Sequence, residues 1–210
     1  MNELTQPVSG GGLTTPILGG ALAVPGRGFE GMTDRSDLII PRAKLLQALS
    51  PEVTSGAKAG VIINSLTLEA LPPRVVPIFA FKTYMRFNPR NKTDAAFDAA
   101  FDPGALIWRS TNPDDPKVQA QCGFGPNGEK PLSLTCLNFF SLFPGVSMPI
   151  IASFSKTSYK TGKQLLSLAR FCGGDMWSRA YQLGAELQNN DQGTYYTFEV
   201  KPLGDSSAEE

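Results

Sequence analysis

Residues 79–91, FAFKTYMRFNPRN, combine cations and aromatic rings at alternate positions. In a strand, successive side chains point to opposite faces, so the two kinds of residue would separate. One face, which we expect to be exposed and positively charged, carries Lys82, Tyr84 and Arg86 and continues into Arg90 and Lys92. The opposite face, which we expect to lie in the core, carries Phe79, Phe81, Thr83, Met85 and Phe87. Cations beside aromatic rings are the groups that hold the phosphates and stack on the bases of single-stranded nucleic acid.

Two later segments repeat this combination of cations and rings. The first carries Lys156, Tyr159, Lys160 and Lys163. The second, interpreted as a strand, carries on one face Trp177, Arg179 and Tyr181. Each residue also has an ordinary structural interpretation, because tyrosines on strands are often half-buried, lysines are usually solvated and tryptophan is usually a core residue. The three clusters together favour a nucleic-acid-binding surface.

Catalytic chemistry has little support in the sequence. The absence of histidine excludes a Ser-His-Asp or Cys-His arrangement and histidine-ligated zinc or iron. No glycine-rich phosphate loop stands between a predicted strand and a predicted helix. Asp94, Asp98 and Asp102 recur at four-residue spacing, which is more typical of a solvated helical face than of an acid–base pair. We therefore expect no enzyme activity, and an enzyme that uses carboxylates with magnesium is the remaining catalytic alternative.

Three cysteines and an N-terminus without a signal-peptide pattern argue against a disulfide-stapled secreted domain. Cys122 and Cys136 flank a turn-rich segment, and Cys172 is distant from both. Because no CxxC pair is present, free cysteines are favoured over a zinc site. We expect no metal and no cofactor. No apolar run approaches the length needed to span a bilayer, so we expect a soluble protein that does not bind membranes.

The charge of the chain is neutral overall but unevenly distributed. The 210 residues have a formal net charge of zero and a pI of about 6.3, so no global field attracts nucleic acid. Residues 74–92 contain five basic residues and no acid, and residues 156–170 contain four basic residues and no acid. Residues 186–210 contain six acids against one lysine. Any binding of nucleic acid must therefore be local.

The composition and the order of the predicted elements favour a mainly β fold. The 17 prolines and 21 glycines without a period indicate many turns. We predict strands at 61–69, 74–87, 132–143 and 147–159, and a hairpin of two strands across the turn at 188–193. Pro77 indicates an edge position or a bulge within its strand. Residues 41–49 are compatible with a short helix or an irregular edge segment.

Two helices are predicted between these strands. The alanine-rich segment at 92–101 has Phe97 and Phe101 four residues apart, as on one side of a helix. The segment at 160–172 places on one helical stripe Leu165, Leu168, Ala169 and Cys172. Short antiparallel strands with one or two helices suit a small Greek-key β-barrel, of which the OB-fold is a common nucleic-acid-binding form.

The predicted domain runs from residue 38 to residue 204. Residues 1–37 are rich in glycine, proline, threonine and serine and cannot form a core of their own. This arm is expected either to lie on its own domain or a neighbouring subunit, giving a homo-oligomer, or to be a flexible tail. Residues 205–210 form a short acidic tail, which would either recruit replication or recombination proteins or simply solubilise the terminus.

Three segments give the chain a resemblance to a known group. In this order and spacing, they are IPRAKLLQALSPEV, TSYKTGKQLLSLAR and MWSRAYQLGAELQNNDQGTYYTFEVKPLG. They resemble bacteriophage single-stranded DNA-binding proteins of OB-fold type, over residues 40–204. Such relatives often carry a cysteine-rich insert suggestive of zinc, of which this chain keeps only Cys122 and Cys136.

The resemblance implies a function in the cytoplasm of an infected bacterial host. We expect a single-stranded DNA-binding protein of phage replication or recombination that binds without sequence preference. The alternative is a phage structural or assembly protein whose N-terminal arm packs on neighbouring subunits and whose surface cations join those subunits.

Overall fold

The computed structural model describes residues 39–191 and 193–207. The residues from Ile40 onward form one compact unit. The predicted N-terminal arm lies outside the described residues, as do residues 208–210 of the predicted acidic tail.

Strands dominate the described part of the chain, as the composition predicts. They are β1 (Arg42–Leu45), β2 (Ile62–Asn64), β3 (Arg74–Phe87), β4 (Leu106–Ser110), β5 (Leu134–Leu142), β6 (Ile150–Ser155), β7 (Arg179–Asn190) and β8 (Gly193–Asp205). The helices are α1 (Pro51–Thr54), α2 (Pro116–Gln121) and α3 (Tyr159–Phe171), with 3-10 turns η2 (Lys156–Ser158) and η3 (Met176–Ser178).

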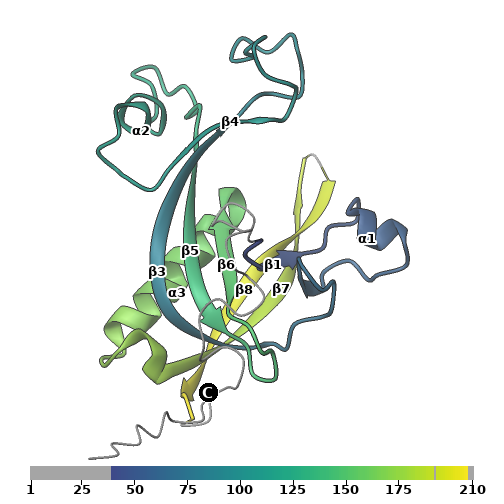
Figure 1. Cartoon of the computed structure of the whole chain (residues 1–210), viewed down its shortest axis with the longest axis vertical. Helices are drawn as coiled ribbons and strands as arrows, with labels where there is room; N and C mark the ends of the chain where they lie inside the picture. The colour runs from purple at the N-terminus through teal and green to yellow at the C-terminus, as the bar shows by residue number, and fades with distance from the viewer. Residues whose placement is uncertain (1–38, 192, 208–210) are drawn as a thin grey trace, which may run out of the picture. The chain divides into compact units, whose positions relative to one another are not determined.

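The strands form one strongly curled sheet. Over the described residues its order is β2-β1-β6-β5-β3-β7-β8, and β4 pairs with β3 beside this path. β3 is long and curved, and α3 packs against β5, β6 and β8 (Figure 1). The result is an OB-like half-barrel with helical decorations, which confirms the predicted fold class. No helix among the described residues is long and apolar enough to cross a membrane.

A β-bulge in β3 decides which side chains face the core. Pro77 pairs with Ser141 of β5, but Phe79 pairs with Phe140, so Ile78 is the extra residue. Val75 before the bulge and Ala80 after it both pack against the core cluster, although strict alternation over five residues would place them on opposite faces. The bulge expected at Pro77 is therefore confirmed, and it reverses the alternation for the rest of the strand.

This reversal corrects the predicted faces of β3 in part, since Lys82 is exposed and Thr83 is buried as predicted. Tyr84, expected to be exposed, has 8% of its surface accessible, whereas Phe79 and Phe87, expected in the core, are 49% and 45% exposed. α2 is bound to this end of the face on which Tyr84 lies. Gln121 of α2 accepts hydrogen bonds there from Arg86 Nη1 (3.4 Å) and from Trp108 Nε1 (3.2 Å).

The alanine-rich segment predicted to be a helix forms consecutive turns instead. Asp94 Oδ1 accepts a hydrogen bond from the Ala96 amide, and Asp98 Oδ1 accepts one from the Ala100 amide. Each aspartate thus binds the backbone two residues further along the chain, which competes with helical hydrogen bonding. Asn88 of the preceding segment holds the turns in place, because its Nδ2 donates to the Asp98 carbonyl oxygen at 2.9 Å.

Other predicted elements are confirmed with changed bounds. The hairpins β5–β6 and β7–β8 and the helix α3 are present. The predicted strand at 61–69 is limited to β2. The prediction of a short helix or an irregular edge segment at 41–49 is wrong, because β1 pairs with both β2 and β6 and is therefore internal to the sheet. Residue 205, placed in the tail by the sequence, ends β8. Ser206 donates a hydrogen bond to the Ser178 carbonyl oxygen.

The core lies between α3 and the curled sheet. Leu165 and Ala169 of α3 are buried as predicted, but Cys172 is exposed, since it follows the last turn of the helix. Gly162 is the point of closest approach between α3 and β6. A Cβ atom built at Gly162 would lie 2.6 Å from Cβ of Phe154, closer than two such atoms can pack.

Gly162→Ala should lower the free energy of unfolding by about 1–3 kcal/mol, the usual effect of overpacking a core contact. In an unconstrained helix the same change would stabilise, since alanine is the better helix former. The control is Gly123→Ala, because a Cβ at Gly123 has open space around it. Urea denaturation measures both variants, and a Gly162→Ala protein as stable as the parent would contradict this contact.

Tyr84→Ala should lower the free energy of unfolding by about 3–5 kcal/mol, because it removes a buried aromatic side chain. Phe79→Ala, in the same strand, should cost about 1 kcal/mol, the contribution of one stacked ring pair. Thermal unfolding of the two variants tests the assignment of faces. The opposite order of stabilities would mean that the bulge is misplaced.

Candidate nucleic-acid interface

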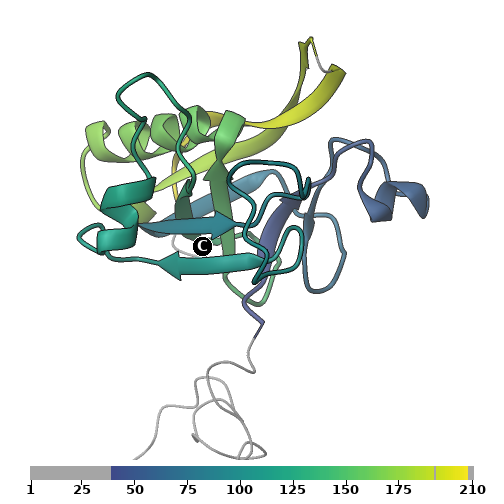
Figure 2. The same ribbon diagram turned by 90° about the horizontal axis from the view of Figure 1, so that it is seen from above.

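A polar groove runs between the start of α3 and the β7–β8 hairpin. Three adjoining hollows, of about 380, 390 and 320 Å³, share Thr157 and Tyr195 in their walls. Lys156 lines the first hollow and Lys160 the second. We call these hollows together the hairpin groove. The far end of the β7–β8 hairpin projects beyond the other strands (Figure 2).

The turn from β6 into α3 places the lysines of the groove. Lys156 has a backbone φ of 50°, a left-handed conformation that is uncommon for a residue with a side chain. This turn redirects the chain into η2 and then into α3, where Lys160 lies in the first turn. Thr161 fastens the helix to the opposite wall, because its hydroxyl donates a hydrogen bond to the Phe198 carbonyl oxygen of β8 at 2.9 Å.

The tyrosines of β8 form the other wall of the groove. Tyr196 is bound to Gln47 through two hydrogen bonds: the Tyr196 amide donates to Gln47 Oε1 at 2.8 Å, and Gln47 Nε2 donates to the Tyr196 carbonyl oxygen at 2.9 Å. The Tyr196 ring packs so closely on Gly60 that no Cβ would fit there. Tyr195, the preceding residue in the strand, is half-buried and lines all three hollows. It is the aromatic side chain best placed to contact a ligand.

The groove has a positive balance. Lys156 and Lys160 are exposed and form no ion pair with a carboxylate among residues 39–191 and 193–207. Glu186 is the acidic residue among those that line the three hollows. Two unpaired ammonium groups beside a tyrosine can hold phosphates and stack on one base.

The remaining predicted residues of this cluster have structural partners. Tyr159 is half-buried against the core cluster, and Lys163 Nζ lies 5.8 Å from the centre of its ring. This cation–π contact covers the ring that the sequence predicted as a stacking surface. Sequence reasoning missed Tyr195. The signal that could have found it is its position just after the hairpin turn, on a strand that lies opposite the basic start of α3.

The other predicted binding residues do not line the groove. Lys82, Arg90 and Lys92 are exposed on β3 and the segment after it. Arg179 pairs with Asp205 at 3.4 Å. Trp177 is 53% exposed but belongs to η3, so the predicted strand face with Arg179 and Tyr181 is wrong; Tyr181 itself is fully buried.

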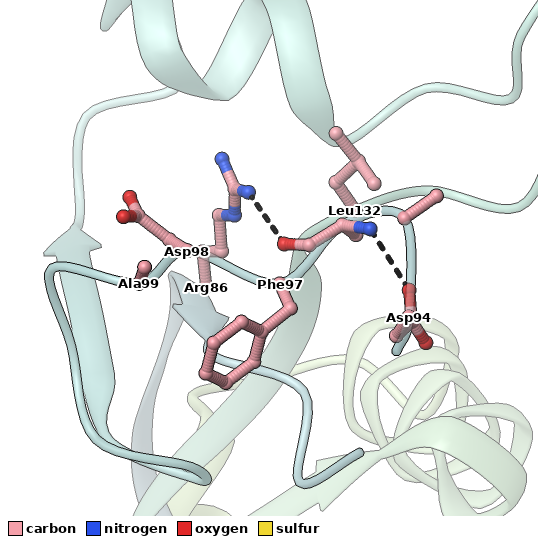
Figure 3. A pocket seen from close by; sticks show the side chains of 8 residues that line it. Arg86, Asp94, Phe97, Asp98, Ala99 and Leu132 are labelled. Carbon is pink, nitrogen blue, oxygen red and sulfur yellow. Dashed lines mark hydrogen bonds between the residues drawn. The ribbon is translucent and has the colours of Figure 1, made fainter. Parts of the chain in front are cut away.

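Another hollow, of about 600 Å³, lies beside Arg86 and does not suit a polyanion. Arg86 Nη2 donates a hydrogen bond to the Ala96 carbonyl oxygen at 3.2 Å, which occupies part of the guanidinium. Asp94 and Asp98 also line this hollow, on the same segment (Figure 3). Two carboxylates beside one arginine repel phosphate, so we assign no binding role to Arg86 here.

The cysteines lie apart. Burial raises the pKa of the Cys122 thiol, against hydrogen bonds with Ser133 and Thr135. Thr135 and Cys136 are adjacent in β5, so their side chains point to opposite faces of the sheet. Because the Cys122 thiol bonds to Thr135, Cys122 and Cys136 lie on opposite sides of the sheet. Within the described part of the chain, no three cysteine or acidic side chains gather to hold a metal ion.

Comparison with known families places the chain. The model of the family described as Pam3 phage gp34-like protein matches residues 11–210. The chain belongs to this family. It is therefore a bacteriophage protein, as the sequence resemblance implied. No curated protein and no solved structure matches the chain.

We expect purified protein to contain no stoichiometric zinc and to keep its thermal midpoint in EDTA, because the thiols cannot share one ion. Elemental analysis and thermal unfolding with and without chelator provide the measurement. One zinc per chain, together with a midpoint that falls in EDTA, would contradict this expectation.

Proposed function

We propose that this phage protein binds single-stranded DNA without sequence preference, and that the hairpin groove holds part of the strand. The observation that carries the proposal is the convergence of Lys156, Lys160 and Tyr195 on one open groove. The lysines come from the turn before α3 and from its first turn, and the tyrosine comes from a strand on the opposite wall. Phosphates would lie against the lysines while a base stacks on the tyrosine.

The groove suits a single strand better than a duplex. Stacking on Tyr195 requires a base whose face is free, and in a duplex the faces of the bases are covered by their neighbours. Stacking is also tolerant of sequence, since every base has a π face. Because the chain is neutral overall, affinity would come from these local contacts and from counterion release rather than from a long-range field.

Affinity for a thirty-nucleotide oligo-dT should fall steeply with salt and exceed affinity for duplex DNA of the same length. Fluorescence anisotropy over a series of salt concentrations measures both. In the variant with Lys156→Ala and Lys160→Ala, the slope of log K against log salt should become shallower by about 1.4, or about 0.7 for each lost phosphate contact. Lys117→Ala is the matched control, since Lys117 is an exposed lysine on α2.

The outcomes of this experiment separate the proposals. No binding to oligo-dT at low salt would contradict the proposed function and favour the assembly protein with an N-terminal arm. If the double variant and the control variant weaken binding equally, the protein binds DNA but the hairpin groove is not the binding site. Recruitment of replication or recombination proteins by the acidic tail stays a prediction, because the last three residues lie outside the described structure.

A further inference from the structure

The face of the sheet opposite α3 carries an exposed aromatic cluster. Phe79 of β3 stacks on Phe140 of β5, with ring centres 5.0 Å apart and an interplanar angle of 22°. Phe81 lies next to Phe79, with ring centres 5.8 Å apart. About half of the Phe79 side chain is exposed, so one side of the cluster is open to solvent. We call this surface the aromatic face.

The register of the sheet places an arginine in the same row. Phe79 pairs with Phe140, Phe140 pairs with Ile151, and Ile151 pairs with Arg42 of β1. Paired residues point to the same side of a sheet, so these four side chains lie in one row, in which Ile151 is buried between Phe140 and Arg42. With adjacent strands about 4.8 Å apart, the line from Phe79 to Arg42 spans about 14 Å.

Two further cations stand at the same face. Arg109 of β4 pairs with Met85, two residues beyond Thr83 on the strand that carries Phe79. Burial lowers the pKa of Arg42, and the charge of Arg109 lowers it further. Burial raises the pKa of the Cys136 thiol, while the positive charges of Arg42, Arg109 and Lys156 each act to lower that pKa. Within residues 39–191 and 193–207, none of the three cations is paired with a carboxylate. Among the described residues, positive charge therefore collects here without a carboxylate to neutralise it.

A buried polar network holds this surface rigid. Arg42 Nη1 donates a hydrogen bond to Ser153 Oγ at 2.9 Å, and Ser153 Oγ donates to Asn138 Oδ1 at 2.8 Å. Asn138 Nδ2 in turn donates to Thr83 Oγ1 at 2.9 Å. The network links β1, β6, β5 and β3, and its hydrogen-bonded members fix the arginine relative to the phenylalanines.

We infer that the aromatic face is a second contact surface for single-stranded DNA, on which unpaired bases stack on Phe79 while Arg42 and Arg109 bind the flanking phosphates. This inference rests on the proposed function and adds the element that would select unpaired bases. The two surfaces adjoin, because Ser153 and Lys156 both line the first hollow of the hairpin groove and Ser153 also binds Arg42. One strand can thus continue from the groove onto the sheet.

The chemistry of the face favours a nucleic acid over a protein partner. An apolar protein surface would leave the unpaired guanidinium groups of Arg42 and Arg109 without an anion. A strand of DNA supplies both a π face for the phenylalanines and a phosphate for each arginine, and arginine binds phosphate through well-directed hydrogen bonds.

The direct test introduces a fluorophore at the aromatic face. In a Phe79→Trp variant, addition of oligo-dT should quench the new tryptophan emission, after subtraction of the parent signal from Trp108 and Trp177. Heparin, which carries negative charge without bases, should bind and leave that emission unchanged. Equal quenching by oligo-dT and heparin would overturn base stacking on Phe79. An emission that stays unchanged at saturating oligo-dT would also overturn it.

Affinity measurements provide the second test. Phe79→Ala should weaken binding of oligo-dT by about five- to hundredfold, the range covered by loss of one base–aromatic stack, and leave heparin binding unchanged. Arg109→Ala should make the salt slope shallower by about 0.7. The control is Phe171→Ala, because Phe171 is 85% exposed at the end of α3, on the other side of the sheet.

The outcomes distinguish this inference from the proposed function. If oligo-dT binds and only the groove variants weaken it, the aromatic face is excluded and the proposed function stands. If oligo-dT does not bind to the parent protein, the proposed function and this inference are both wrong. If Phe79→Ala changes the oligomeric state by analytical ultracentrifugation and leaves DNA affinity unchanged, the face is a protein contact and the inference is wrong.

Discussion

One inserted residue in β3 determines how the rest of the domain is arranged. The bulge at Ile78 lets Val75 and Ala80 face the same core although they are five residues apart. As a result, the second half of the strand presents Tyr84 to the side covered by α2, and Phe79 to the side away from α3. The aromatic face lies where it does because the core is built on the other face of this strand.

The sequence predicts the class of the fold well, because that depends on patterns repeated along many residues. The apolar stripe of α3 and the alternation in β7 and β8 are long enough to outweigh local exceptions. Pro77 even indicates the bulge. What the alternation could not show is that one extra residue inverts every side chain after it, so Tyr84 and Phe79 were assigned to the wrong faces.

The candidate site was predictable only in part, since its two halves are far apart in the sequence. Lys156 and Lys160 belong to a basic segment that is visible in the chain, and the structure places both in the groove. Tyr195 joins them only through the hairpin. The helix prediction at 92–101 was wrong for a different reason. The alanines favour a helix, but the short side chains of Asp94 and Asp98 accept hydrogen bonds from nearby backbone amides and stabilise turns instead.

The close contact between Gly162 and Phe154 also determines the position of α3 along the sheet. A helix that slides by one residue would bring a larger side chain against Phe154, so α3 has a single permitted register on the sheet. Lys160, two residues before Gly162, is therefore held at a constant height above the strands. The surface is assembled before any ligand arrives, and association would lose little conformational entropy on the protein side. Most of the ordering on binding would then fall on the ligand.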